Sequence, residues 1–262
     1  MDLIVFSGQS NMQGQTESLP SPARVRGAGE YCFTEDKVRP LCHPVGEDIG
    51  DGLLLAAHEG HGSLLPDFCR AYVRETGRKV LAVHAAKGAT TAAEWLPEHP
   101  SGRYAALVRK VQGAKKAAGE VGRIAFVWLQ GESDALEGCS QAEYMRRLRA
   151  LRGHLLRDIG QDVFALIRVG KFTGDARDIP ILRAQEALAE SGEFVLLTRV
   201  TGDCTQHPER YINPFAAGHY NNRAMRRIGK AAGRALARWY AGMPICLEKE
   251  PYPELRDQNP EK

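Results

Sequence analysis

Five short apolar runs, each rich in β-forming residues, recur along the chain and alternate with stretches of helical periodicity. The runs lie at 3–6, 80–84, 124–129, 163–169 and 194–199. Little polar alternation interrupts them, which is typical of strands buried on both faces. The helical patterns lie at 64–75, 105–118, 142–156, 181–190 and 221–240. This alternation predicts an α/β fold, a three-layer α/β/α sandwich with a five-stranded, mostly parallel, doubly wound sheet and right-handed crossovers.

The 262 residues fit one α/β domain, which we expect to span residues 1–245. Residues 20–60 interrupt the alternation, because they are rich in Gly, Pro, Glu and Asp and show little periodicity. They predict an irregular loop insertion beside the active face. Prolines among charged residues at 246–262 predict an extended or disordered tail.

Composition argues against several classes of protein. The 35 Lys and Arg residues against 32 Asp and Glu give a net charge of +3, too small and too evenly spread for a nucleic-acid-binding surface. The sequence has no 18-residue apolar run and no cleavable signal, so we expect no membrane span and a cytoplasmic location. Six scattered cysteines without a Cys-x-x-Cys pair indicate free thiols rather than a zinc site.

Polar segments marked by glycine follow four of the five runs, where ligands bind in an open parallel sheet. They are Gly8-Gln9-Ser10-Asn11, 86–91, Gln130-Gly131-Glu132-Ser133-Asp134 and Thr201-Gly202-Asp203. A strand-to-helix turn lifts a serine hydroxyl off the sheet, which makes Ser10 the candidate nucleophile. Taken alone, this turn favours a helix-capping serine over a catalytic one.

A serine nucleophile needs a base, and imidazole has a suitable pKa. His219 stands at the entrance to the last predicted helix, from which a loop can carry it over the strand ends; His207 is the second choice. By composition alone, an exposed capping histidine is the commoner role for such a residue.

The two carboxylates of the 130–134 segment, Glu132 and Asp134, have three interpretations. One of them orients the histidine, or both bind a divalent metal, or they complement the start of a helix. A metal site needs further oxygen ligands at a recognisable spacing, which the sequence lacks. Trp128 fits the core, whereas Trp95 fits either the core or a sugar-stacking surface.

Four motifs stand out together: Gly8-Gln9-Ser10-Asn11-Met12-x-Gly14, Ala86-Lys87-Gly88-Ala89-Thr90 with Trp95, Gln130-Gly131-Glu132-Ser133-Asp134, and Gly218-His219-Tyr220-Asn221. In these motifs and their order, from residue 3 to about residue 240, the chain resembles the SGNH (GDSL-like) hydrolase superfamily, and more closely its branch of sialate O-acetylesterases and family 6 carbohydrate acetylesterases.

The resemblance implies Ser10 as nucleophile and His219 as base. It also implies an oxyanion hole made by the N–H groups of Ser10 and Gly62 and the side-chain amide of Gln130, with no metal or other cofactor. Members of the superfamily usually place an Asp three residues before the histidine, where this chain has Ala216. Glu132 is then the first choice for the orienting acid and Asp203 the second.

The resemblance predicts a serine esterase that removes acetyl groups from sugar hydroxyls through an acetyl-enzyme. We expect the acetylated sugar to contact Gln9, Asn11, Lys87, Gly88 and Trp95. Two alternatives remain. A lipid or thioester acyl hydrolase of the same fold needs a long apolar trough, and a catalytically silent glycan-binding protein is suggested by Ala216.

Overall fold

The computed structural model describes residues 1–21, 23–57 and 61–255, and within them seven strands form one sheet in the order β3-β2-β4-β1-β5-β6-β7. All neighbouring pairs are parallel except β2–β3. The strands are β1 (Asp2–Gly8), β2 (Ala28–Cys32), β3 (Lys37–Pro40), β4 (Val80–Ala86), β5 (Ile124–Leu129), β6 (Val163–Ile167) and β7 (Val195–Thr198).

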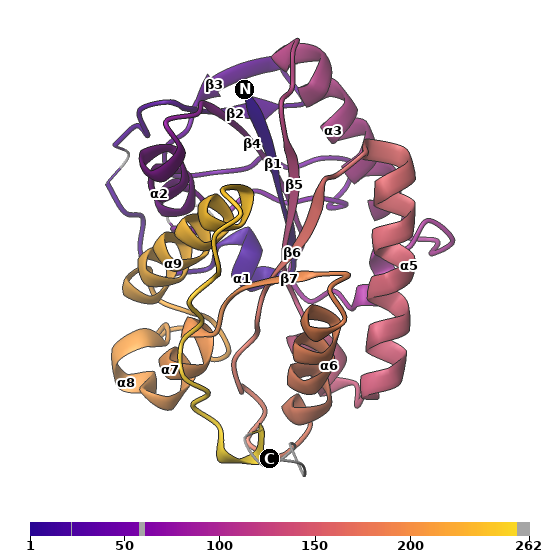
Figure 1. Cartoon of the computed structure of the whole chain (residues 1–262), viewed down its shortest axis with the longest axis vertical. Helices are drawn as coiled ribbons and strands as arrows, with labels where there is room; N and C mark the ends of the chain where they lie inside the picture. Colours follow the sequence, from indigo (N-terminus) through magenta and orange to yellow (C-terminus); the bar gives the residue numbers. More distant parts are fainter. Residues whose placement is uncertain (22, 58–60, 256–262) are drawn as a thin grey trace.

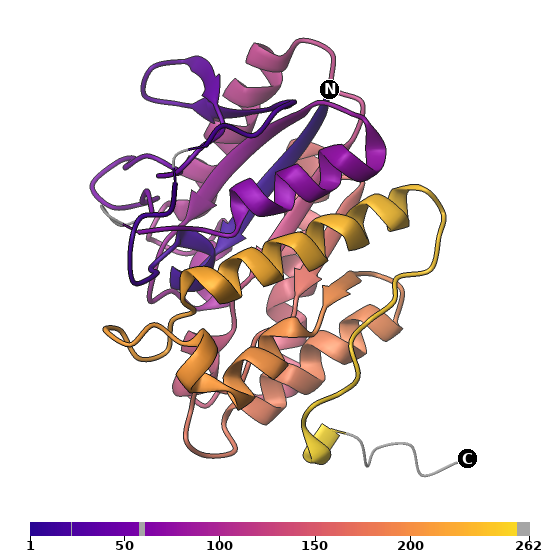
Figure 2. The same ribbon diagram turned by 90° about the vertical axis from the view of Figure 1, so that its left-hand side faces the viewer.

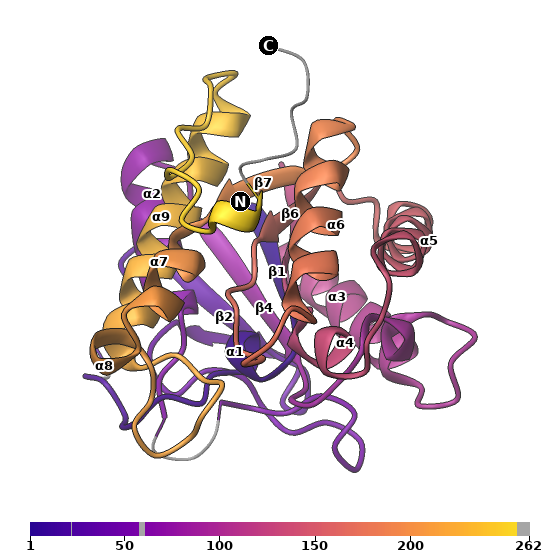
Figure 3. The same ribbon diagram turned by 90° about the horizontal axis from the view of Figure 1, so that it is seen from below.

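Helices cover both faces of the sheet and give three layers (Figures 1 and 3). One face carries α2 (Leu65–Thr76) and α9 (Asn222–Tyr240), which run side by side (Figure 2). The other carries α3 (Arg103–Ala118), α5 (Gln141–Ile159) and α6 (Asp178–Glu190). The shorter helices are α1 (Ser10–Gln13), α4 (Glu132–Leu136), α7 (Val200–Gln206), α8 (Pro208–Tyr211) and the 3-10 turns η1 (Ala92–Trp95) and η2 (Pro253–Leu255).

The predicted α/β/α class is confirmed, and all five predicted strands are present. The sheet has two more strands than predicted, because β2 and β3 form a hairpin inside the expected loop insertion at 20–60. β2 was missed because it contains Glu30, which is only 1% exposed. The Gly46 N–H and the Arg39 side chain bond its carboxylate, so a charged residue occupies a buried strand position.

The C-terminal segment is extended from residue 246 to Tyr252, ends in the turn η2 and contacts the body of the domain. The Glu248 carboxylate accepts hydrogen bonds from the hydroxyl of Thr198 and the N–H of Arg199, at the end of edge strand β7. Tyr252 is only 3% exposed. Of the two predicted states for residues 246–262, extended or disordered, the structure shows the extended one as far as Tyr252, while residues 256–262 lie outside the described residues.

Register brings the predicted motifs to one edge of the sheet. Gly8, the last residue of β1, lies opposite Ala86 of β4 and Leu129 of β5, so the segments after these three strands emerge side by side. Gly8 has φ 145°, and a Cβ there would overlap the carbonyl oxygen of Leu129. Only glycine fits this close approach, which ends the strand and lets α1 start at Ser10. Across the described helices, we find none with the length and hydropathy that a membrane span requires.

Candidate active site

A cavity of about 570 Å³ opens at the carboxyl ends of the strands. It brings together Ser10, His219 and Glu132, with Gln9, Lys87 and Gly88 from the predicted substrate contacts. The remaining lining residues are Gln13, Gln15, Leu55, Ala89, Ser133, Leu136, Phe172, Thr173, Ala217 and Gly218.

Ser10 is the first residue of α1 and is 6% exposed. Its N–H belongs to the first turn, whose N–H groups have no acceptor within a helix. The preceding Gln9 directs its side chain across the sheet edge, and its Oε1 accepts hydrogen bonds from the N–H groups of Gly131 (3.4 Å) and Ser133 (3.1 Å). The serine turn is thereby fixed to the turn that carries Glu132.

His219 lies on a loop between α8 and α9 and is half-buried. Its Nδ1 lies 3.0 Å from the carbonyl oxygen of Ala217. An Nδ1–H that donates to this carbonyl leaves the lone pair on Nε2, the tautomer that a general base requires. Asn213 closes the loop, because its N–H donates to the carbonyl of His219 and its side-chain amide to the carbonyl of Gln15.

Glu132 begins α4 and lines the same cavity, yet it is only 6% exposed. Its Oε1 accepts a hydrogen bond of 2.7 Å from Asn11, while its Oε2 is buried with no hydrogen-bond partner among the described residues. Burial raises the pKa of this carboxyl to about 7, although the Asn11 hydrogen bond acts in the opposite direction.

Asn11 connects Glu132 to the histidine loop. The same side-chain amide also donates to the carbonyl of Gly218, and its Oδ1 accepts from the N–H of Tyr220, so the amide bonds both neighbours of His219. Asn11 is fully buried and is not among the residues that line the cavity. The expectation that it contacts the substrate is therefore wrong, since its hydrogen bonds hold the site together from behind.

Gln130 does not point into the cavity. Its Nε2 donates to the carbonyl of Thr90 at 2.9 Å and to Oδ2 of Asp134 at 2.6 Å, so both amide protons are engaged. The prediction of Gln130 in the oxyanion hole is therefore wrong. Asp134 also accepts from the N–H of Ala92 and from Arg147, so this carboxylate ties η1 and α5 to the 130–134 turn.

Gly62 is likewise turned away from Ser10. Its N–H donates to the hydroxyl of Thr16 at 2.5 Å, and it is not among the cavity-lining residues, so its predicted oxyanion role is wrong. Gly88 lies closer, because a Cβ added there would be 3.3 Å from the Ser10 Cβ. The N–H of Gly88 donates to Gln13, and the next residue, Ala89, has φ 55° and lines the cavity.

Three other predicted residues lie elsewhere. Asp203, the second choice for the orienting acid, forms an ion pair with Arg227 and faces His207 at 3.8 Å; neither Asp203 nor His207, the second choice for the base, is a lining residue. Trp95 is fully buried and donates its Nε1–H to the Thr90 hydroxyl. It is a core residue rather than a sugar-stacking one.

The sequence did not predict the apolar side of the cavity, which is formed by Leu55, Leu136, Phe172 and Ala217. Phe172 and Thr173 follow β6, the fourth apolar run, and Gly170 was the available signal that a site segment begins there. Leu55 comes from the insertion, where no local pattern indicated a site. Across the described residues, no group of three or more metal-binding side chains is found.

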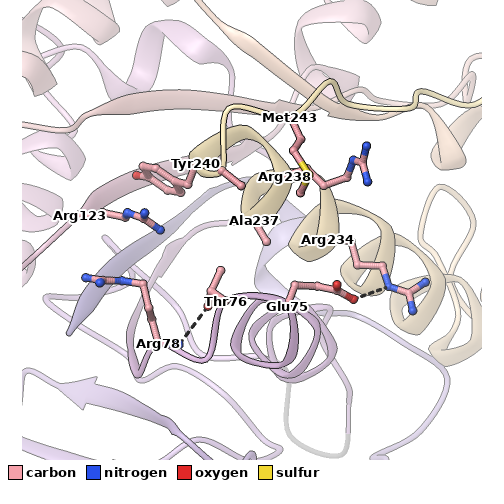
Figure 4. A pocket seen from close by; sticks show the side chains of 10 residues that line it. Glu75, Thr76, Arg78, Arg123, Arg234, Ala237, Arg238, Tyr240 and Met243 are labelled. Carbon is pink, nitrogen blue, oxygen red and sulfur yellow. Dashed lines mark hydrogen bonds and ion pairs between the residues drawn. The ribbon is translucent and has the colours of Figure 1, made fainter.

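A second cavity, of about 510 Å³, lies near the ends of α2 and α9 (Figure 4). Its arginines already have partners: Arg78 pairs with Asp2 and Arg234 with Glu75, and Arg123 stacks over the Tyr240 ring. Helix carboxyl ends also attract cations. These contacts account for the positive charge, and the described lining of this cavity contains no serine and no histidine.

A mostly parallel α/β/α sandwich with a serine shortly after its first strand and a histidine just before its last helix, both lining one cavity, is the arrangement that the resemblance to SGNH (GDSL-like) hydrolases predicts. A family model described as carbohydrate esterase, sialic acid-specific acetylesterase, matches residues 1–238. The chain belongs to this family.

Individual relatives are distant in sequence but similar in fold. A probable carbohydrate esterase from Arabidopsis thaliana is 23% identical over 205 residues, which cover 71% of this chain and 75% of that protein. Its X-ray structure superposes with a TM-score of 0.70 at 21% identity, covering 94% of this chain and 99% of the other. NanS gives a TM-score of 0.60 at 16% identity, covering 92% and 98%. A carbohydrate acetylesterase from Xanthomonas citri gives 0.57 at 13% identity, covering 92% and 56%.

Proposed function

We propose that this protein is a serine-dependent O-acetylesterase that removes acetyl groups from sugar hydroxyls. The observation that carries the proposal is that Ser10 and His219 line one cavity, with the Ala217 carbonyl bonded to the histidine Nδ1. The family description and the structurally similar carbohydrate acetylesterase from Xanthomonas citri support an acetyl ester as the bond that is cleaved.

The reaction begins when His219 Nε2 takes the proton of the Ser10 hydroxyl and the oxygen attacks the acetyl carbonyl. The oxyanion of the tetrahedral intermediate accepts hydrogen bonds from the Ser10 N–H and from the N–H of Ala89, because the Gly88 N–H of the same turn already donates to Gln13. Its collapse expels the sugar oxygen, which receives the proton from His219. Water, activated by the same imidazole, then attacks the acetyl-enzyme, and acetate and free Ser10 result.

Glu132 is the acid that we assign to this site, in place of the Asp that Ala216 replaces. It acts through Asn11, whose amide joins the Glu132 carboxylate to the carbonyl of Gly218 beside His219. The Ala217 carbonyl fixes the imidazole tautomer, so the two tasks that one carboxylate performs in a serine triad are divided between a carbonyl and a buried acid.

The lining of the cavity fits a sugar, and we propose an acidic one. Lys87 lines the cavity and is the residue that we assign to pair with a sugar carboxylate, while Leu55 and Phe172 provide apolar surface for the faces of the ring. The family description, which names sialic acid, points in the same direction.

The same apolar side supports a second candidate function. Leu55, Leu136 and Phe172 would also accommodate a longer acyl chain, as in a lipid or thioester acyl hydrolase. A series of esters from acetyl to octanoyl separates the two, because a sugar acetylesterase loses kcat/KM as the acyl chain lengthens, whereas an acyl hydrolase gains it.

The decisive experiment measures acetate release from an O-acetylated sugar by the wild type, Ser10→Ala and His219→Ala. We expect each variant to lose more than about a thousandfold in kcat, because the nucleophile and its base act as one unit.

Ser7→Ala is the matched control. Ser7 is a buried serine on β1, three residues before Ser10, and its hydroxyl has no hydrogen-bond partner among the described residues, so activity should stay within twofold. Equal rates for wild type and Ser10→Ala would refute the serine mechanism. Sugar binding without turnover in the wild type would favour the silent glycan-binding alternative.

A further inference from the structure

The segment 246–255, which we call the C-terminal strap, runs from α9 along the β7 edge towards the lower end of the molecule in Figures 1 and 2. Charged contacts fasten it. Glu250 forms an ion pair with Arg168, whose side chain is fully buried directly after β6. The same arginine is bonded to Glu186 of α6, so the strap joins a buried charge network and does not lie loosely on the surface.

Tyr252 is the most deeply buried residue of the strap, at 3% exposure. Its hydroxyl accepts a hydrogen bond of 2.9 Å from the N–H of Lys171 and is also hydrogen-bonded to the hydroxyl of Thr205. The Lys171 ammonium lies 5.6 Å from the centre of the Tyr252 ring and pairs with Glu254 at 2.8 Å. The strap therefore holds Lys171 by its backbone and by its side chain.

Lys171 leads directly into the cavity wall, because the next two residues, Phe172 and Thr173, both line the cavity. The Phe172 ring packs edge-on against Tyr220, at 5.1 Å between ring centres, and Tyr220 is the fully buried neighbour of His219. Gly170 passes just behind, where an added Cβ would lie 2.8 Å from the Tyr220 hydroxyl. Residues 170–173 are thus packed between the strap and the histidine loop.

We propose that Tyr252 is a positioning residue for substrate binding, which holds the 170–173 segment so that Phe172 and Thr173 form one wall of the sugar subsite. This inference rests on the proposed esterase function. Without the Tyr252 hydroxyl, the N–H of Lys171 loses its acceptor and the wall can withdraw from the cavity. The substrate then binds more weakly, while Ser10 and His219 still react with what is bound.

The test compares Tyr252→Phe with Tyr104→Phe in the full chain. Tyr104 is a matched control because it is 6% exposed, donates its hydroxyl to Asp158 at 2.6 Å and is not a lining residue of the cavity. With an O-acetylated sugar, we expect Tyr252→Phe to raise KM at least fivefold with kcat within twofold, and Tyr104→Phe to leave both within twofold. Hydrogen exchange of the Lys171 amide should quicken at least tenfold in Tyr252→Phe and stay unchanged in Tyr104→Phe.

The split between KM and kcat separates positioning from simple loss of stability, because partial unfolding lowers the apparent kcat and leaves KM unchanged. An unchanged KM in Tyr252→Phe would overturn the inference, whatever happens to kcat. If Tyr252→Phe does not fold, Thr205→Val takes its place. It removes the Thr205 contact that orients the Tyr252 hydroxyl and leaves the contacts with Lys171 and Gly202, so a smaller KM rise of at least twofold is expected and an unchanged KM is again contradictory. Full activity in Ser10→Ala would instead refute the esterase mechanism, and that result is independent of the Lys171 exchange rate.

Discussion

At the scale of single residues, Asn11 has the most unusual position in the site. It is fully buried, and its one side chain bonds Glu132, the carbonyl of Gly218 and the N–H of Tyr220. Asn11→Ala should therefore lower kcat by about ten- to a hundredfold with little change in KM, because the histidine loop loses its attachment while Leu55, Lys87 and Phe172, the proposed sugar contacts, make no hydrogen bond with Asn11. Steady-state kinetics on an acetylated sugar measures this, and an unchanged kcat would show that the loop is held without Asn11.

The buried carboxyl group of Glu132 lowers the stability of the folded protein, although we propose that activity requires it. Burial raises its pKa from 4.5 to about 7, so the folded state holds the proton more tightly than the unfolded chain does. As pH rises from about 4.5 to about 7, Glu132 ionises in the unfolded chain but stays protonated in the folded protein, which lowers the free energy of unfolding. The decrease reaches about 3 kcal/mol above pH 7. Glu132→Gln, which is neutral and can still accept from Asn11, should be more stable than the wild type at pH 8 by about 1–3 kcal/mol, equal at pH 4.5, and less active. Urea unfolding at the two pH values measures the difference. A variant that is no more stable than the wild type at pH 8 would show that the carboxylate is not penalised by burial.

At the scale of elements, α2 and α9 approach each other through glycine. A Cβ on Gly233 of α9 would overlap the backbone carbonyl oxygen of Phe68 in α2. Gly233→Ala should lower the free energy of unfolding by about 1–3 kcal/mol or more, because backbone rather than a flexible side chain must move. Gly153 is the matched control. It lies within α5 with nothing within 4 Å of an added Cβ, so Gly153→Ala should stabilise the protein by about 0.5–1 kcal/mol. Chemical denaturation of both variants gives the comparison, and equal effects would contradict close packing of α2 on α9.

The sequence predicted the elements whose buried residues form a simple pattern, either an unbroken apolar run or an apolar stripe along a helix. β1, β4, β5 and β6 are covered on both faces and read as apolar runs, and α9 has a clear apolar stripe. β2 was not predicted because Gly29 and Glu30 break its apolar run, and the Gly46 N–H that bonds the Glu30 carboxylate lies in the irregular segment after the hairpin. The contacts of the C-terminal strap were not predicted either, because the buried Arg168 that pairs with Glu250 lies 82 residues away in the sequence.

At the scale of the whole molecule, the candidate site was predictable as far as strand ends determine it. Ser10, Glu132 and His219 line one cavity because β1, β5 and the last helix reach one edge of the sheet, which the order of elements already indicated. The direction of a side chain depends on its partners. The amides of Gln130 and the N–H of Gly62 are turned inward by Asp134 and Thr16, contacts that no local pattern shows.

Buried histidines set the response of the whole fold to acid. Desolvation lowers the pKa of His84 from 6.5 to about 3 and that of His43 from 6.5 to about 4, so both stay neutral in the folded state while the unfolded chain takes up two protons below pH 6.5. Glu132 acts in the opposite direction, because in this pH range its carboxyl group is protonated in the folded state and ionised in the unfolded chain. The net difference of about one proton predicts that the free energy of unfolding falls by about 1.4 kcal/mol per pH unit as pH drops from 6 to 5.

Burial also raises the pKa of Glu30, which makes this slope shallower towards pH 5. Above pH 7 the histidine contribution is complete and the curve should level off. Urea unfolding at half-unit steps from pH 5 to 8 measures the profile. In Glu132→Gln the opposing proton is absent, so the slope between pH 6 and 5 should approach twice the wild-type value. A wild-type stability that stays flat or rises on acidification would mean that the unfolded chain gains no protons relative to the folded one, and therefore that His43 and His84 are not both held neutral by the fold.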